Sequence, residues 1–432
     1  MIRMSLKNIG AGLLMAALIA GAGVLSQSGK NAYAATTVPG SNEVIAIGGT
    51  TDGLPVNAPI GPQGYSSDGN IIAFTSLATN LPNAGGSGGL YIYNIKANTT
   101  ARVDMSTSGT LPNGNLYWNI RVSETGRYVT FGSLATNLID GTTTGQGMYY
   151  KRDTQAGTTT LIGGYYGNGW TQNIDRNLAV SNDGRFSLLA SRLKANGYPN
   201  NYGIVLGEDV SGTYTWTSLG IDSNGGLNSA NSAAVQGDLS CDGSFAAFQQ
   251  DYLVRLSDLR RGSTIKISVG QGDSTSPIIS CNGRYVLYAT TNRTQITPTP
   301  SGMDTYMHLV RYDRITGERM YVDSNSSGVF STAHLAWNHV SNEAPENLFN
   351  ASIADTGDVV FNYNGNMYLK HLSDGSGTLE AIAKTAGGTY VNVTSGKMTE
   401  DGRYTFFMAD PYDLGLAPSA SSAQLIRAKT GL

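Results

Sequence analysis

Short apolar runs alternate with polar turns along nearly the whole chain. No long stretch repeats its apolar residues with the helical period of about 3.6 residues. The runs are rich in β-branched and aromatic residues, and Gly, Asn, Asp and Ser bound them, which is typical of strands and turns. The pattern therefore predicts an all-β protein.

One phrase occurs seven times: an apolar strand, a tight polar turn ending in Gly, and a second apolar strand. Successive motif glycines lie 57, 58, 59, 40, 74 and 45 residues apart. Asp-Gly and Asn-Gly tolerate the positive φ angles of a two-residue hairpin turn, and Asp caps turns through the backbone, so we interpret these residues as structural. The turn residues concerned are Asp68, Gly69, Gly126, Asp183, Gly184, Asp242, Gly243, Gly283, Gly357, Asp401 and Gly402.

Each unit continues with a loop and two further strands, and a four-stranded repeat of this length is typical of a β-propeller blade. The seventh unit lacks a fourth strand before Leu432, whereas the segment 43–48 stands alone before the first unit and resembles the other fourth strands. Pairing the two would protect an open sheet edge. We predict one seven-bladed β-propeller over residues 35–432, monomeric, whose ring is closed by the N-terminal strand completing the last blade.

The turn phrase, with Ser-Leu-Ala-Thr-Asn-Leu after it at 76–81 and 133–138, resembles the TolB-like propeller repeats, also called PD40 or WD40-like repeats. The resemblance covers roughly residues 41–432 and implies the fold. It leaves the function open, because that superfamily includes transport accessories, binding scaffolds, lyases and peptidase gating domains. We expect neither the α/β domain that precedes the TolB propeller nor the hydrolase domain of prolyl oligopeptidase-like proteins.

The first 34 residues are typical of a secretory signal peptide. Arg3 and Lys7 precede an apolar run at 11–25, and Ala-Tyr-Ala at 32–34 forms a cleavage site. The run is shorter than the roughly 20 residues of a membrane span. We predict a secreted, periplasmic or cell-surface protein without a membrane span after cleavage; an uncleaved N-terminal anchor is the alternative.

Charge narrows the range of partners. Only 14% of the residues are charged and the net charge is −3. With so few Lys and Arg residues, the chain lacks the basic surface that binds nucleic acids. It also gives no reason to expect an anionic membrane as partner. We therefore expect neither.

The only cysteines, Cys241 and Cys281, each lie two residues before a turn glycine in adjacent repeats. Equivalent positions of neighbouring blades approach each other near a propeller axis, and an exported compartment favours oxidation. We predict a disulfide between them; two buried free thiols and a metal or redox role are the alternatives.

Motifs for other chemistry are absent. His334 and His339 lie near Glu343 and Glu346, but their spacing matches no metal-binding motif, and the chain has no nucleophile elbow or phosphate loop. His308 and His371 fall within expected strands. Loops beginning at Asp140 and Asp222 lack the alternating oxygen donors of a calcium loop. We expect no cofactor and no resident metal; calcium is the alternative.

Aromatic residues offer the better functional hint, since Tyr and Trp give contact area at low entropic cost. The predicted ligand-binding residues are Tyr117, Trp118, Tyr166, Trp170 and Trp337, although packing between blades would also explain them. The primary hypothesis is an exported, non-enzymatic scaffold that binds a protein or an envelope component such as a glycan. The alternative is a carbohydrate-binding or polysaccharide-active propeller, lyase-like or hydrolase-like, with a site in the central channel.

Overall fold

The described residues of the computed structural model are 42–85, 88–140, 147–164, 173–193, 201–219, 236–250, 252–270, 273–296, 307–324, 351–363, 366–383, 391, 393–416 and 424–430. Their regular elements are strands, and no helix among them is long and apolar enough to cross a bilayer. The expected all-β class is confirmed.

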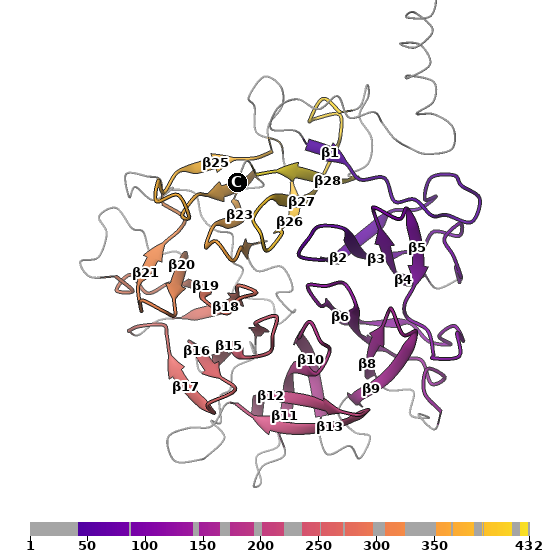
Figure 1. The fold of residues 1–432 in the computed structure, drawn as a ribbon, viewed down its shortest axis with the longest axis horizontal. Helices are drawn as coiled ribbons and strands as arrows, with labels where there is room; N and C mark the ends of the chain where they lie inside the picture. Colours follow the sequence, from indigo (N-terminus) through magenta and orange to yellow (C-terminus); the bar gives the residue numbers. More distant parts are fainter. Residues whose placement is uncertain are drawn as a thin grey trace, which may run out of the picture.

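The strands form seven four-stranded antiparallel blades in a ring (Figure 1), as the repeat predicts. The first three blades, ordered from the axis outward, are β2 (Ile60–Tyr65), β3 (Ile71–Ser76), β4 (Gly89–Asn94) and β5 (Thr99–Arg102); β6 (Leu116–Val122), β7 (Tyr128–Ser133), β8 (Met148–Asp153) and β9 (Thr158–Gly164); and β10 (Asn173–Val180), β11 (Phe186–Leu193), β12 (Asn201–Val210) and β13 (Thr213–Ser218). A single parallel pair, Asn173 with Gly164, joins the second and third blades into one eight-stranded sheet.

The next three blades are β14 (Gly237–Leu239), β15 (Phe245–Gln250), β16 (Leu253–Asp258) and β17 (Ser263–Lys266); β18 (Ser274–Ile279), β19 (Tyr285–Thr290), β20 (His308–Asp313) and β21 (Arg319–Tyr321); and β22 (Ser352–Ile353), β23 (Val359–Tyr363), β24 (Asn366–Lys370) and β25 (Leu379–Ala381). The seventh blade holds β26 (Thr394–Met398), β27 (Tyr404–Ala409) and β28 (Gln424–Lys429), with β1 (Asn42–Val44) as its outer strand.

The N-terminal strand closes the ring, as predicted. β1 pairs antiparallel with β28, with Val44 opposite Ile426. The following backbone N–H of Ile45 donates to the carbonyl of Leu425 at 2.8 Å. Ile45 and Ile47 are buried in a cluster that also contains Phe406 of the seventh blade. This pairing covers the edge that the short last unit would otherwise leave open.

The core lies between the blades because both faces of each middle strand are covered. Leu90 of the first blade and Val129, Phe131 and Tyr150 of the second are fully buried in one cluster. On the opposite face of β7, Thr130 is also buried. Strands buried on both faces carry nearly continuous apolar runs instead of a strict alternation.

The repeated turn is longer than expected. In the first blade, the N–H of Ser66 donates to the carbonyl of Ile71 and the N–H of Gly69 donates to the carbonyl of Ser66, each at 2.9 Å. Four residues therefore separate the closing pair, and the two-residue turn is wrong. Gly69 has φ of +64°, whereas Asp68 is not in the left-handed region. The carboxylate of Asp68 instead accepts hydrogen bonds from Ser66 Oγ at 2.6 Å and from the Asn70 N–H at 2.9 Å.

The motif arginines fasten blades internally. Arg127 and Arg284 form ion pairs of 2.8 Å with Asp153 and Asp313 of the third strand in the same blade. Each guanidinium also lies over the aromatic ring of the next residue, as Arg127 does over Tyr128 at 5.0 Å. These contacts give the arginines a structural role.

Candidate functional site: the axial ring

One turn position of every blade converges on the propeller axis at the same end of the molecule. It is the residue between the motif Ser (or Ala, Thr) and the motif Asp, Asn or Thr. We call the seven residues at this position the axial ring: Ser67, Glu124, Asn182, Cys241, Cys281, Asp355 and Glu400. Cys241 is buried and the other six are half-buried.

Hydrogen bonds and a disulfide join each blade to the next through this ring. Backbone N–H groups of Ser67, Asn182, Cys241 and Asp355 donate to the ring-residue carbonyl of the next blade at 2.6–2.9 Å. The N–H of Thr125 donates to Asn182 Oδ1 at 3.1 Å, and the N–H of Asn282 donates to Asp355 Oδ1 at 2.8 Å. Glu400 and Ser67 interact through their side chains. The axial ring therefore connects all seven blades.

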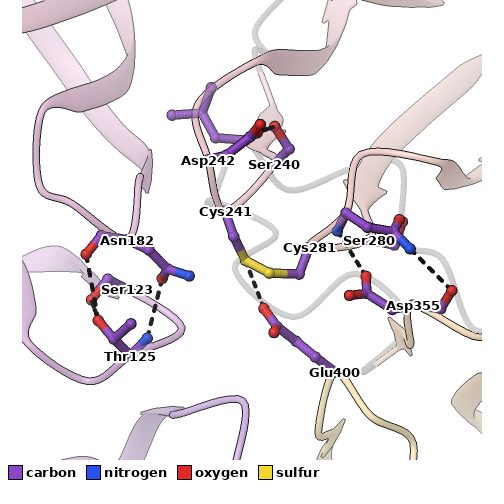
Figure 2. The surroundings of a disulfide bond; sticks show 12 residues. Ser123, Thr125, Asn182, Ser240, Cys241, Asp242, Ser280, Cys281, Asp355 and Glu400 are labelled. Atoms are coloured by element: carbon purple, nitrogen blue, oxygen red, sulfur yellow. Dashed lines mark hydrogen bonds between the residues drawn. A yellow bond between two sulfur atoms is a disulfide. The ribbon is translucent and has the colours of Figure 1, made fainter.

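A disulfide joins Cys241 to Cys281 between the fourth and fifth blades, with the Cα atoms 4.6 Å apart. This distance lies within the range of about 4.4–6.8 Å in which bridges form. Figure 2 shows the carboxyl of Glu400 pointing at this bridge from the seventh blade. Its Oε1 atom lies 2.6 Å from Cys241 Sγ. A bonded sulfur has no hydrogen, so any hydrogen in this contact belongs to the carboxyl.

The carboxyl groups of the axial ring resist ionisation. Burial, followed by the charges of Glu124 and Asp355, raises the pKa of Glu400 to about 9. Burial also raises the pKa of Glu124 to about 7; the positive charge of Lys397 opposes this rise, and Asp238 and Asp355 add to it. Burial likewise raises the pKa of Asp355. Like charges sharing a poorly solvated site cannot all ionise cheaply.

A second charged layer lies three residues earlier on the inner strands. Arg121 on β6, Asp238 on β14 and Lys397 on β26 hold this position. Burial raises the pKa of Asp238. Hydrogen bonds from the N–H groups of Ile279 and Leu239 lower this pKa, and so do the charges of Lys397 and Arg121, but burial is the larger effect. Together the two layers carry four carboxyl groups and two cationic side chains, so carboxyl groups outnumber cationic groups at this end of the channel.

Three residues of the axial ring have the composition of a metal-binding group. Ligand atoms of Cys241, Cys281 and Glu400 lie within 4.8 Å of one another. Metals bind thiolates, however, and both sulfurs are used in the disulfide. In the oxidised chain this group offers only the Glu400 carboxyl.

The axial ring was missed in the sequence apart from its two cysteines. The structure places Tyr117 and Trp118 within the inner strand β6, at a bulge between Tyr117 and Arg121. Tyr166, Trp170 and Trp337 lie outside the described residues. Their ligand-binding role remains a prediction. One feature of the sequence could have indicated the ring. The residue type at the position before the motif Asp changes from blade to blade, whereas the residues on either side of it repeat.

Two of the histidines lie in described strands or turns. His308 is buried, and its Nδ1 atom lies 2.8 Å from Asp323 Oδ2. His371 Nε2 lies 3.2 Å from Glu380 Oε2 near the outer edge of the sixth blade. His334, His339 and the loop at 222–226 lie outside the described residues.

Comparison with known proteins supports the propeller fold but identifies no family. Neither a family model nor a curated protein matches the sequence. Among solved structures, an oligogalacturonate lyase in complex with manganese is 10% identical, covers 90% of this chain and 96% of its own, and gives a TM-score of 0.52. The oligogalacturonate lyase of Vibrio parahaemolyticus is 11% identical with the same coverage and TM-score. These likenesses show the propeller fold alone.

TolB propellers are also among the structural neighbours. TolB from Acinetobacter baumannii is 12% identical, and the match covers 88% of this chain and 65% of that one with a TM-score of 0.37. The chain is thus a seven-bladed β-propeller with TolB propellers and lyases among its structural neighbours, and membership of the TolB-like family remains a prediction.

Proposed function

We propose that the chain is an exported, non-enzymatic scaffold that binds a protein or envelope component at the axial-ring end of the propeller. The ligand presents a positively charged group, such as a Lys or Arg side chain, to this end. Export is supported by the signal-like pattern of residues 1–34.

The observation that carries the proposal is the cluster of carboxyl groups around Glu124. Its carboxyl is half-buried, its pKa is raised to about 7, and no hydrogen bond to it is found among the described residues. A cation placed against this carboxyl would favour its charged form and relieve the repulsion from Asp355 and Asp238. Complementary charge of this kind increases specificity and association rate more than affinity.

Isothermal titration calorimetry at pH 7.5 with three peptides of equal length tests this proposal: one rich in Lys and Arg, one neutral and one acidic. We expect only the basic peptide to bind, more weakly as salt is raised. Glu124→Gln should weaken its binding by about tenfold, or about 1.4 kcal/mol. Glu318→Gln removes an exposed carboxyl from an outer turn of the fifth blade and serves as the control. Equal binding by E124Q and the native chain, or no binding of the basic peptide, would refute the proposal.

A carbohydrate-active site is the second candidate, and one observation favours it. The pKa of Glu124, about 7, is where a general acid or base works best at neutral pH. The acidic surroundings would repel a uronate polymer, so a neutral or amino sugar is the expected substrate. A reducing-end assay on such polysaccharides tests this candidate: activity abolished in E124Q would support an enzyme, and no release of sugar ends would exclude it for the substrates used.

A further inference from the structure

We propose that the Cys241–Cys281 disulfide is a thiol-exchangeable bond in the folded protein, with Cys281 as the sulfur that an external thiol attacks and Glu400 as the acid that protonates the departing sulfur of Cys241. This proposal does not rest on the proposed function.

The two sulfurs differ in access. Cys241 is 8% exposed, whereas Cys281 is half-buried in the adjacent turn. Exchange requires a thiolate to approach one sulfur in line with the bond while the other leaves. Access therefore favours attack at Cys281, and Cys241 becomes the leaving group.

The leaving sulfur is the one that faces an acid. Glu400 Oε1 lies 2.6 Å from Cys241 Sγ, and the two residues come from the seventh and fourth blades (Figure 2). The charges of Glu124 and Asp355 act on Glu400, which contacts Cys241. The same charges would disfavour a free thiolate on Cys241, so a proton supplied to that sulfur assists bond cleavage. Glu400 is positioned to donate one, and its pKa of about 9 keeps it protonated at neutral pH.

The step balances with a thiol as the co-reactant. The external thiolate forms a bond to Cys281 Sγ and the S–S bond breaks. Its electron pair passes to Cys241 Sγ, which takes the proton of Glu400. The products are a mixed disulfide on Cys281, a thiol on Cys241 and a carboxylate on Glu400. A second thiol then releases the mixed disulfide, so that two external thiols are oxidised and the protein bridge is reduced.

The charge of Glu124 also predicts which of two thiols reacts faster. Above the pKa of Glu124, about 7, its carboxylate attracts a cationic thiol and repels an anionic one. Cysteamine should therefore react faster than 2-mercaptoethanesulfonate when the two are compared at equal thiolate concentration. This preference should be lost in the guanidinium-unfolded chain, where the carboxyls are dispersed.

The experiment incubates the folded full chain with each thiol, traps free thiols with iodoacetamide and locates the adducts by mass spectrometry. We expect the thiol adduct on Cys281 and the alkyl group on Cys241. Glu400→Gln should slow exchange by about 100-fold, the size of a general-acid effect, whereas Glu318→Gln should leave it unchanged. Reaction only after unfolding, an adduct on Cys241 or an unchanged rate in E400Q would overturn the proposal.

A pH profile separates an acid from a structural residue. In the native chain the rate should rise with the thiolate fraction and fall above pH 9, where Glu400 loses its proton. E400Q should lose the fall. If E400Q does not give a cooperative unfolding transition, Glu400→Asp provides the second variant: it keeps the fall but reacts more slowly, because its carboxyl is withdrawn from Cys241. A native profile without a fall would also overturn the proposal.

Discussion

The carboxyl of Glu400 crosses the propeller axis and contacts Cys241, 159 residues away in the chain, with Oε1 2.6 Å from Sγ. The two residues occupy equivalent turn positions in non-adjacent blades. The channel is therefore narrow at this end, and its chemistry is set by the residues that precede the motif Asp, Asn or Thr.

The disulfide should stabilise the ring measurably. Cys241 and Cys281 are 40 residues apart, and closing a loop of that length is worth about 4 kcal/mol in the chain-entropy account. The double variant Cys241→Ser/Cys281→Ser should lower the free energy of unfolding by up to about that amount in a urea titration. Alkylation of the unreduced native protein at two thiols would contradict the bridge.

Gly126 should be far less replaceable than Gly317. Both have positive φ, of +70° and +74°, but a Cβ on Gly126 would lie 2.7 Å from the side chain of Ile71 in the neighbouring blade, whereas one on Gly317 would meet nothing within 4 Å. Gly317→Ala should cost only the backbone strain, of the order of 1 kcal/mol. Gly126→Ala should cost about 1–3 kcal/mol more because the blades must separate. Equal losses in thermal unfolding would contradict this packing role.

The closing strand should be essential for stability. Ile45 is 7% exposed and packs between the first and seventh blades, whereas Leu54 is 57% exposed. Ile45→Ala should destabilise the protein by about 2–4 kcal/mol through lost burial and a residual cavity. Leu54→Ala should change stability by no more than about 0.5 kcal/mol. Similar denaturation midpoints for the two variants would show that the N-terminal segment does not complete the seventh blade.

Stability should fall as pH rises from about 5 to 9. The pKa values of Glu124 and Glu400 are raised in the fold to about 7 and about 9. The folded state therefore binds more protons than the unfolded state over this range. The stability that these groups contribute is fully present below their unfolded pKa and is lost as pH passes their folded values. The melting temperature should decline across this window, and the decline should be shallower in Glu124→Gln. An E124Q profile parallel to that of the native chain would argue against the raised pKa.

The sequence alone determined the architecture because the signals for it are local. The Ser-x-Asp-Gly turn satisfies its hydrogen bonds within about six residues, as at Ser66–Ile71. Each blade can therefore be recognised from a short stretch of sequence. The number of repeats and the missing last strand then required the N-terminal segment to close the ring. The predicted turn length was wrong because Asp68 accepts hydrogen bonds instead of adopting a positive φ. The residue pattern alone does not distinguish these two roles of Asp.

The candidate site was decided by tertiary structure. The residue before the motif Asp is free to vary, since the turn forms with Ser67, Asn182 or Glu400 in that place. Only the circular arrangement of blades brings these positions together across the axis. There, burial and shared charge raise the pKa of Glu124 and Glu400, and no spacing along the chain encodes that proximity. Sequence specified the blades; the closed ring placed an acid against a disulfide.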